Sequence, residues 1–96
     1  MTSKERAYLR GLANTLQPIF QIGKGGISDV LLKQLDDALE ARELIKINVL
    51  ETAPDGIKNI GEQIAISTNS AFVQKVGNKI TLYRPRKKDP KIILPN

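Results

Sequence analysis

The sequence predicts one compact α/β domain in which three helices pack on a mixed four-stranded sheet. Its 96 residues suffice for a single hydrophobic core. Hydrophobic residues make up 41% of the chain and charged residues 26%, a mixture typical of globular proteins. The apolar spacing changes along the chain in the order helix, strand, helix, strand, helix, strand, strand, with helices long enough to cross over a sheet.

The first helix is predicted to begin at the segment Thr2-Ser3-Lys4-Glu5, which has the pattern of a capping box. Helical spacing then relates the apolar residues Tyr8, Leu9, Leu12, Ala13 and Leu16, whereas Lys4, Arg6 and Arg10 occupy the opposite face. Pro18 marks the point by which this helix has ended. Residues 18–22 form a short apolar segment between proline and glycine, which predicts a buried strand with Phe20 in the core.

The second helix is predicted to follow Ser28, a favourable N-cap residue, with Asp29 in its first turn. Its apolar side comprises Leu31, Leu32, Leu35, Ala38 and Leu39, and the acidic residues Asp36, Asp37 and Glu40 are expected to face water. Residues 45–49 then alternate between apolar and polar side chains, as a strand with one buried face does.

The last third of the chain is predicted to contain a helix and a hairpin. A polar turn over residues 51–56 precedes a helix whose apolar residues are Ile57, Ile60, Ile64 and Ala65; Gly61 weakens this helix, and the polar run 67–70 ends it. Two strand-like segments, 71–76 and 79–84, flank the turn residues Gly77 and Asn78. The chain after Pro85 is basic, so we expect a domain over residues 1–86 and a tail over residues 87–96.

The charge of +5 is unevenly distributed along the chain. Residues 1–27 carry a net charge of +3, residues 28–62 one of −4, and residues 63–96 one of +6. If the basic ends meet on one face, they form a surface suited to a polyanion such as nucleic acid. The alternative is that the basic termini serve solubility alone, and that the tail is a solvated segment instead of an arm that follows phosphates.

The composition also argues against several classes of protein. The chain has no cysteine and no histidine, so neither a disulfide nor a thiolate or imidazole metal site can form, and we expect no metal or cofactor. The carboxylates of Asp36, Asp37 and Glu40 have no accompanying histidine or cysteine, which argues against catalysis. The polar N-terminus and the lack of a long apolar run predict a cytoplasmic protein without a membrane span, and we expect a monomer.

A glycine-rich loop separates the first predicted strand from the second helix. Its residues, Gly23, Lys24, Gly25 and Gly26, would bring free backbone N–H groups, a positive helix end and a lysine together, an arrangement that suits an anion. The alternative is that the glycines serve only the geometry of a turn. Neither the nucleotide-triphosphate loop nor the dinucleotide fingerprint is present, and the G-x-x-G pattern resembles the loop with which KH-type domains clamp a nucleic-acid backbone.

Four segments together resemble a known family, the bacterial YhbY-like CRM domain (chloroplast RNA splicing and ribosome maturation). They are Ser3-Lys4-Glu5-Arg6-Ala7-Tyr8-Leu9-Arg10, residues 18–27 around the glycine loop, residues 43–47, and residues 73–84. The resemblance covers residues 2 to 86. It implies a fold similar to the C-terminal domain of bacterial translation initiation factor three, RNA binding by the glycine loop, and association with precursors of the large ribosomal subunit.

We therefore predict a non-catalytic protein that grips ribosomal RNA through its backbone and assists assembly of the large subunit, without a small-molecule substrate. The residues predicted to contact RNA belong to the glycine loop or are basic: Gly23, Lys24, Gly25, Gly26, Lys4, Arg6, Arg10, Arg84, Arg86, Lys87 and Lys88. Tyr83 and Phe72 are candidates for stacking on bases, although Phe72 is expected in the core. The alternatives are a protein-interaction adaptor that uses the acidic second helix and a small enzyme acting on a phosphoryl ligand.

Overall fold

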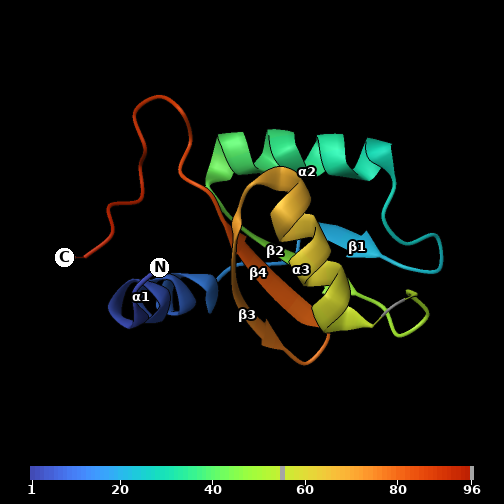
Figure 1. Ribbon diagram of the computed structural model, residues 1–96. Helices are drawn as coiled ribbons and strands as arrows, with labels where there is room; N and C mark the ends of the chain where they lie inside the picture. Colours follow the sequence, from blue (N-terminus) through green and yellow to red (C-terminus); the bar gives the residue numbers. More distant parts are fainter. Residues whose placement is uncertain (55, 96) are drawn as a thin grey trace.

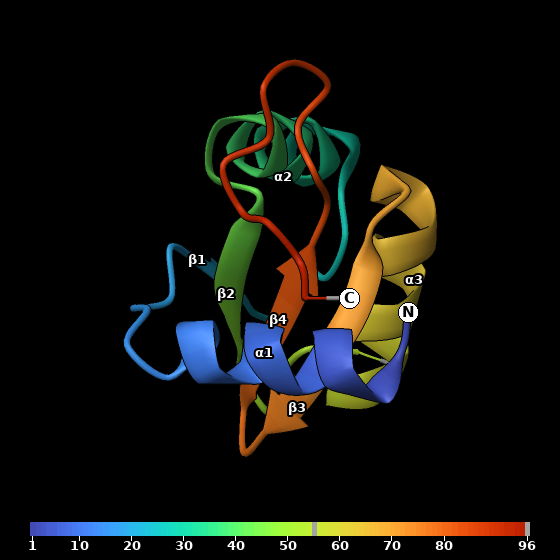
Figure 2. The ribbon, with the colours of Figure 1, turned by 90° about the vertical axis from the view of Figure 1, so that its left-hand side faces the viewer.

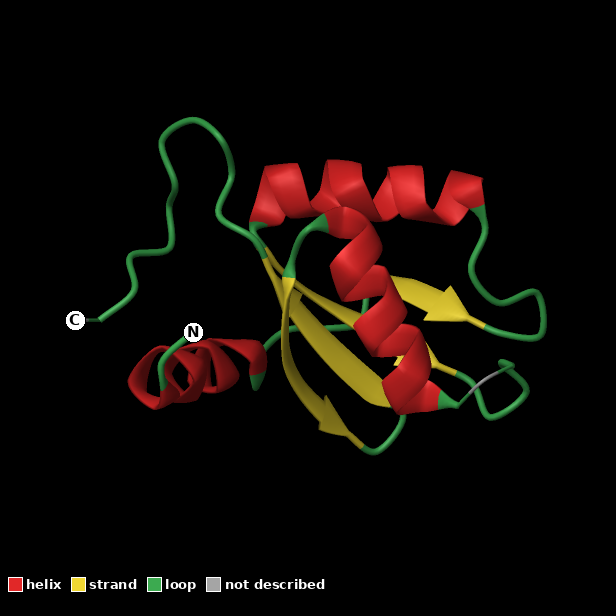
Figure 3. Ribbon diagram, in the orientation of Figure 1, coloured by secondary structure: helices red, strands yellow, loops and turns green. Residues whose placement is uncertain are grey.

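The protein is described here by a computed structural model that covers residues 1–54 and 56–95, and these residues form a four-stranded mixed sheet with helices on both faces (Figures 1 and 3). The elements follow the predicted order: α1 (Ser3–Ala13), β1 (Phe20–Ile22), α2 (Asp29–Arg42), β2 (Leu44–Val49), α3 (Ile57–Thr68), β3 (Ala71–Val76) and β4 (Lys79–Tyr83). The predicted fold class is confirmed. The predicted turn over residues 51–56 includes Asp55, which lies outside the described residues.

Both predicted helix caps at the start of α1 and α2 are confirmed. The Glu5 N–H donates to Thr2 Oγ1 over 3.1 Å, and the Thr2 N–H donates to Glu5 Oε1 over 2.8 Å, which completes the capping box. Hydrogen bonds to the Glu5 carboxylate from the backbone N–H and the side chain of Thr2 hold the pKa of Glu5 below its usual value. At α2, the Leu31 N–H donates to Ser28 Oγ over 3.1 Å. Each cap satisfies an N–H that the helix itself leaves unpaired.

The strand order across the sheet is β1-β2-β4-β3. β1 runs parallel to β2, because α2 crosses between them, whereas β4 is antiparallel to both β2 and β3. β1 begins at Phe20, two residues later than predicted, and the hairpin turns at Gly77, whose φ is +59°. An irregularity between Phe72 and Gln74 shifts the register of β3. The alternation in β2 places Ile45, Ile47 and Val49 on one face, as predicted.

Two hydrophobic clusters lie on the two faces of the sheet. The first lies beneath α2 and α3 and contains Ile22, Leu35, Leu39, Ile45, Ile47, Val49, Ile60, Ile64, Ala65, Ile80 and Leu82. Phe20 and Phe72 pack against it, which confirms their predicted core positions. The second lies beneath α1 and contains Leu9, Ala13, Leu44, Val73 and Tyr83, with Leu16, Ile92 and Leu94 packed against it (Figure 2). The C-terminal tail thus contributes to the packing of the α1 face.

Gly61 has a structural role that its low helix propensity conceals. It is buried in α3, where the helix crosses β3, and an added Cβ would overlap Phe72 Cε2 and lie 3.2 Å from Ile80 Cδ1. The glycine therefore allows α3 to approach the sheet more closely than any other residue would. This close approach offsets the cost of glycine in a helix interior.

Candidate nucleic-acid interface

The glycine loop forms a tight turn between β1 and α2. The Gly26 N–H donates to the Gly23 carbonyl oxygen over 2.9 Å and closes the turn. Gly26 has a φ of +65°, and a Cβ there would lie 3.0 Å from Pro54 Cγ, so both backbone conformation and space demand glycine. Gly25 differs, since nothing lies within 4 Å of a Cβ added at that position and its φ is not positive. The exposed residues Lys24 and Gly25 therefore form an open apex that a phosphate could approach.

The N-terminus of α2 supplies less positive potential than a free helix end would. Ser28 already accepts the N–H of Leu31, and the carboxylate of Asp29 in the first turn offsets part of the positive end of the helix dipole. Attraction of an anion at this loop therefore depends mainly on the loop amides and on Lys24. Beside the loop lies a hollow of about 210 Å³ lined by Gly25, Gly26, Ile27, Pro54, Ile60 and Gln63.

Arg6 and Arg84, both predicted to contact RNA, donate hydrogen bonds to distant segments of the protein. Arg6 Nη1 donates to the carbonyl oxygens of Phe72 and Val73 over 2.6 and 2.7 Å, which fastens α1 to β3 where the register shifts. Arg84 Nη1 donates to Asp36 Oδ1 over 2.6 Å and to the Thr68 carbonyl oxygen over 2.8 Å. These contacts have no local sequence signature, because each joins segments distant in sequence.

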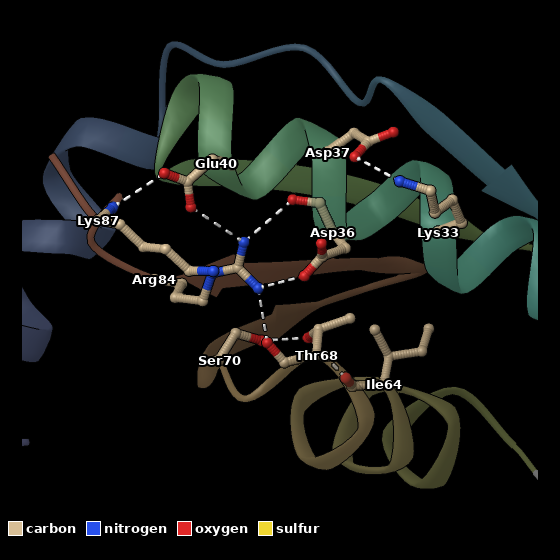
Figure 4. A network of polar contacts seen from close by, with 9 residues as sticks. All are labelled: Lys33, Asp36, Asp37, Glu40, Ile64, Thr68, Ser70, Arg84 and Lys87. Atoms are coloured by element: carbon tan, nitrogen blue, oxygen red, sulfur yellow. Dashed lines mark hydrogen bonds and ion pairs between the residues drawn. The ribbon is translucent and has the colours of Figure 1, made fainter.

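Arg84 connects α2 to the end of α3, as Figure 4 shows. Its Nη2 also donates to the Asp36 carbonyl oxygen over 3.0 Å and lies 3.5 Å from Glu40 Oε1, a buried atom with no hydrogen bond of its own. The hydrogen bond from Arg84 holds the pKa of Asp36 below its usual value. Asp36 and Asp37 are exposed, as predicted, although Asp36 pairs with Arg84 and Asp37 pairs with Lys33 over 3.3 Å. Glu40 differs from the prediction, because it is half-buried and one of its carboxylate oxygens is buried.

The tail folds back onto the domain and is therefore not a fully solvated segment. Glu43 is buried and accepts the backbone N–H groups of Arg86, Lys91 and Ile92, while Ile92 packs on the second cluster. Burial acts to raise the pKa of Glu43, but these three hydrogen bonds outweigh it and the pKa lies below its usual value. Arg86 Nε donates to the Asp89 carbonyl oxygen over 3.0 Å.

Lys87 and Lys88 remain exposed at the bend of the tail, and Lys4 and Arg10 remain exposed on α1. Tyr83, considered as a stacking residue, is only 6% exposed. Burial raises the pKa of the Tyr83 hydroxyl, and the nearby negative charge of Glu43 raises it further. Stacking of an RNA base on Tyr83 is thus incompatible with this packing.

The basic residues fall into two separate places. α1 and the tail lie together at one end of the molecule, and the glycine loop projects from the other end, along a longest dimension of 39 Å (Figure 1). The basic ends of the chain, α1 and the tail, therefore meet, as a shared surface for a polyanion requires, but the glycine loop lies apart from them. The chain order could not reveal this, because only tertiary packing brings the tail against α1.

Within residues 1–54 and 56–95, the acidic side chains do not cluster in a way that could hold a metal ion. Among the helices of the same residues, none has both the length and the apolar character needed to cross a membrane.

The fold and the loop define a small α/β domain with a G-x-x-G turn between its parallel strands. Residues 1–84 match the CRS1 / YhbY (CRM) domain, and the chain belongs to this family. It is 43% identical over 95 residues to the "Probable RNA-binding protein YqeI" of Bacillus subtilis, with 99% of each chain covered.

Two further similarities extend this result. An "RNA-binding protein" of Haemophilus influenzae is 34% identical over 99% of this chain and 95% of its own. The solution structure of the hypothetical protein SAV1595 from Staphylococcus aureus superimposes with a TM-score of 0.83 at 47% identity, covering 99% of both chains. The resemblance to the CRM family inferred from the four segments is therefore confirmed.

The structural role of Glu43 was not predicted from the sequence. Glu43 follows the end of α2 with a φ of +68°, a left-handed conformation that is uncommon outside glycine, and its carboxylate anchors the tail. A buried glutamate with three backbone donors has no local sequence signature, since the donors lie more than 40 residues away.

Proposed function

We propose that this protein binds RNA without catalysing a reaction, and that the glycine loop holds the RNA backbone. The observation that carries the proposal is the open apex at Lys24 and Gly25, which stands on a turn fixed by the positive φ of Gly26. A backbone phosphate could approach the amides of such an apex closely, and Lys24 would add a mobile positive charge. Relatives over nearly the whole chain that are named RNA-binding proteins support this assignment.

The RNA proposed as the partner is large-subunit ribosomal RNA or its precursors, and the proposed role is assistance in subunit assembly by a cytoplasmic monomer. The resemblance to bacterial YhbY-like proteins supports this target. The exposed basic residues Lys4, Arg10, Lys87 and Lys88 would contribute to binding from the α1 end of the molecule. No cofactor, metal or small-molecule substrate is part of the proposal.

The test is a double variant of the loop, Lys24→Glu with Gly25→Asp. Gly25 has open space and no positive φ, so the fold should tolerate aspartate there. Two carboxylates at the apex would repel a phosphate, and we expect the affinity for a large-subunit rRNA fragment to fall at least tenfold at moderate salt. Filter binding measures the affinity, and circular dichroism verifies the fold.

The matched control is Lys33→Glu with Gln34→Glu, which makes the same change of charge on the exposed side of α2. This control should bind RNA within about twofold of the wild-type protein. If the folded loop variant binds as tightly as the wild type, the loop is only a turn. If wild-type binding does not weaken as salt rises, contacts to phosphates do not drive it.

The alternative of a protein adaptor that uses the acidic second helix receives less support. Asp36 and Glu40, two of the three carboxylates on which it depends, are engaged by Arg84 and Lys87 of the same chain.

A further inference from the structure

On the face of the sheet that carries α1, one half has no helix over it. α1 covers the end of the sheet near Leu44 and Tyr83, and the opposite half of the same face carries polar side chains. Gln21 of β1, Asn48 of β2 and Lys79 of β4 lie side by side in one row of the ladder, and Asn48 Nδ2 donates to Gln21 Oε1 over 3.4 Å. Lys46 lies in the next row on this face, which we call the open sheet face.

The strands that form the open sheet face carry basic side chains on it. None of the four strands contains an acidic residue, and Lys46 and Lys79 are diagonal neighbours across the β2–β4 ladder. Diagonal neighbours on one face lie roughly 7–8 Å apart, so the two ammonium groups can hold separate phosphates of one strand. The half-buried Lys46 is not the purely solvated residue that a lysine in an alternating strand suggests.

Arg10 extends this positive surface from α1. On one flank of the helix, Leu12 and Leu16 line a hollow with Ile92 of the tail. Arg6 and Arg10 are four residues apart, which places them together on the other flank. Arg6 donates to the Phe72 and Val73 carbonyl oxygens, so the flank that carries Arg6 and Arg10 faces β3. Figure 2 shows the tail on the other side of α1.

A hollow of about 380 Å³ lies at the β1 edge of this surface. Pro18, Ile19 and Phe20 give it apolar walls, and Gln21, Asn48 and Lys79 give it polar ones. Amide groups can donate to and accept from base edges or ribose hydroxyls, and an apolar wall can receive the face of a base. Cations, amides and an apolar wall next to one another match the chemistry of an RNA strand better than that of a small anion.

We propose that the open sheet face is a second RNA-contacting surface, in which Lys46, Lys79 and Arg10 hold backbone phosphates while Gln21 and Asn48 contact sugars or bases. This inference rests on the proposed RNA binding and adds a surface distinct from the glycine loop. The bound RNA passes over the uncovered sheet between α1 and the hairpin.

The experiment uses the full chain and a hairpin RNA with a single-stranded loop. The variants are Lys46→Gln, Lys79→Gln and the two combined, and Lys33→Gln on α2 is the matched control. Removing one phosphate contact lowers the salt slope of binding by about 1, so the double variant should lose about 2. In the wild-type protein, the side-chain amide NMR signals of Gln21 and Asn48 should shift when the RNA is added.

The outcomes separate this proposal from the proposed function. If the double variant keeps the wild-type salt slope while the Lys24→Glu, Gly25→Asp variant loses affinity, the open sheet face does not bind RNA although the protein does. Unshifted amide signals of Gln21 and Asn48 would contradict the proposal equally. If the wild-type protein binds no RNA, the proposed function itself fails. Because Lys79 is exposed, its single variant remains informative even if Lys46→Gln disturbs the fold.

Discussion

The backbone N–H of Lys91 donates to the carboxylate of Glu43 over 2.8 Å and thereby fastens the tail to the junction of α2 and β2. The same oxygen accepts the N–H of Ile92, and the other accepts that of Arg86. A single buried side chain thus satisfies three backbone donors of a segment that has no regular secondary structure. This contact makes the tail part of the fold, because it holds Ile92 and Leu94 against the second cluster.

Replacement of Glu43 by glutamine should destabilise the protein by roughly 1.5–3 kcal/mol at neutral pH, because a neutral amide accepts fewer and weaker hydrogen bonds than a carboxylate. The pKa of Glu43 is lowered in the folded state, so its stabilising contribution is complete above its ordinary pKa of 4.5 and is lost as the pH falls through the folded-state pKa. Urea denaturation at several pH values measures this. The difference between wild type and variant should therefore shrink in acid.

The corresponding control is Glu51→Gln, which alters an exposed carboxylate and should leave stability unchanged within about 0.5 kcal/mol. A constant difference between the wild-type and Glu43→Gln proteins from neutral pH into strong acid would refute the proposed role of the charge.

Deletion of residues 87–96 should lower the stability of the domain. The deletion removes Ile92 and Leu94 from the second cluster and takes two of the three donors away from Glu43. Loss of this half-buried apolar surface should cost roughly 1–3 kcal/mol. Thermal denaturation of the shortened chain provides the measurement, with Lys87→Ala, Lys88→Ala as the control that removes charge and keeps the tail. Equal melting temperatures for shortened and full-length chains would mean that the tail is not anchored.

Substitution of Gly61 by alanine should destabilise the fold by roughly 1–3 kcal/mol, although alanine is the better helix former. The added methyl group would collide with Phe72, which must move away from α3. Gly11→Ala in α1 is the matched control, because nothing lies within 4 Å of a Cβ there and the helix should gain stability. A Gly61→Ala protein as stable as the wild type would show that the Phe72 ring adjusts without cost.

The fold was predictable because its determinants are local. Capping residues at Thr2 and Ser28, alternation in β2 and the turn at Gly77 are each contained within a few residues. The sequence pattern predicted all seven elements for this reason. It could not assign Gly61 correctly, since the benefit of that glycine arises only when α3 meets Phe72 of β3.

The candidate site was less predictable, because charge in the sequence does not show where a charge points. Lys24 and Gly25 were identified by the local G-x-x-G pattern, and the structure leaves both exposed. Arg6 and Arg84 were grouped with them as free cations, yet their guanidinium groups bind carbonyl oxygens of distant segments. Lys79 was not among the residues predicted to contact RNA, because only the pairing of β2 with β4 places it beside Asn48.

The roles of Arg84 and Lys24 should separate in a single set of measurements. Arg84 has a side chain only 15% exposed, and it joins α2 to α3 through Asp36, Glu40 and the Thr68 carbonyl oxygen. Arg84→Ala would leave Glu40 Oε1 buried without its ion-pair partner, so we expect a loss of roughly 1–3 kcal/mol in the free energy of unfolding. Lys24→Ala, at an exposed loop apex, should change stability by less than about 0.5 kcal/mol.

The effects of the two variants on RNA binding should have the reverse order, with Lys24→Ala having the larger effect. At a temperature where both remain folded, Lys24→Ala should reduce the salt slope of binding by about 1, because one phosphate contact is lost. Arg84→Ala should leave the slope unchanged, since its guanidinium is already occupied within the protein. Denaturation with urea and binding at several salt concentrations give both quantities for each variant. A folded Arg84→Ala protein with a reduced salt slope would instead assign Arg84 to the RNA-binding surface.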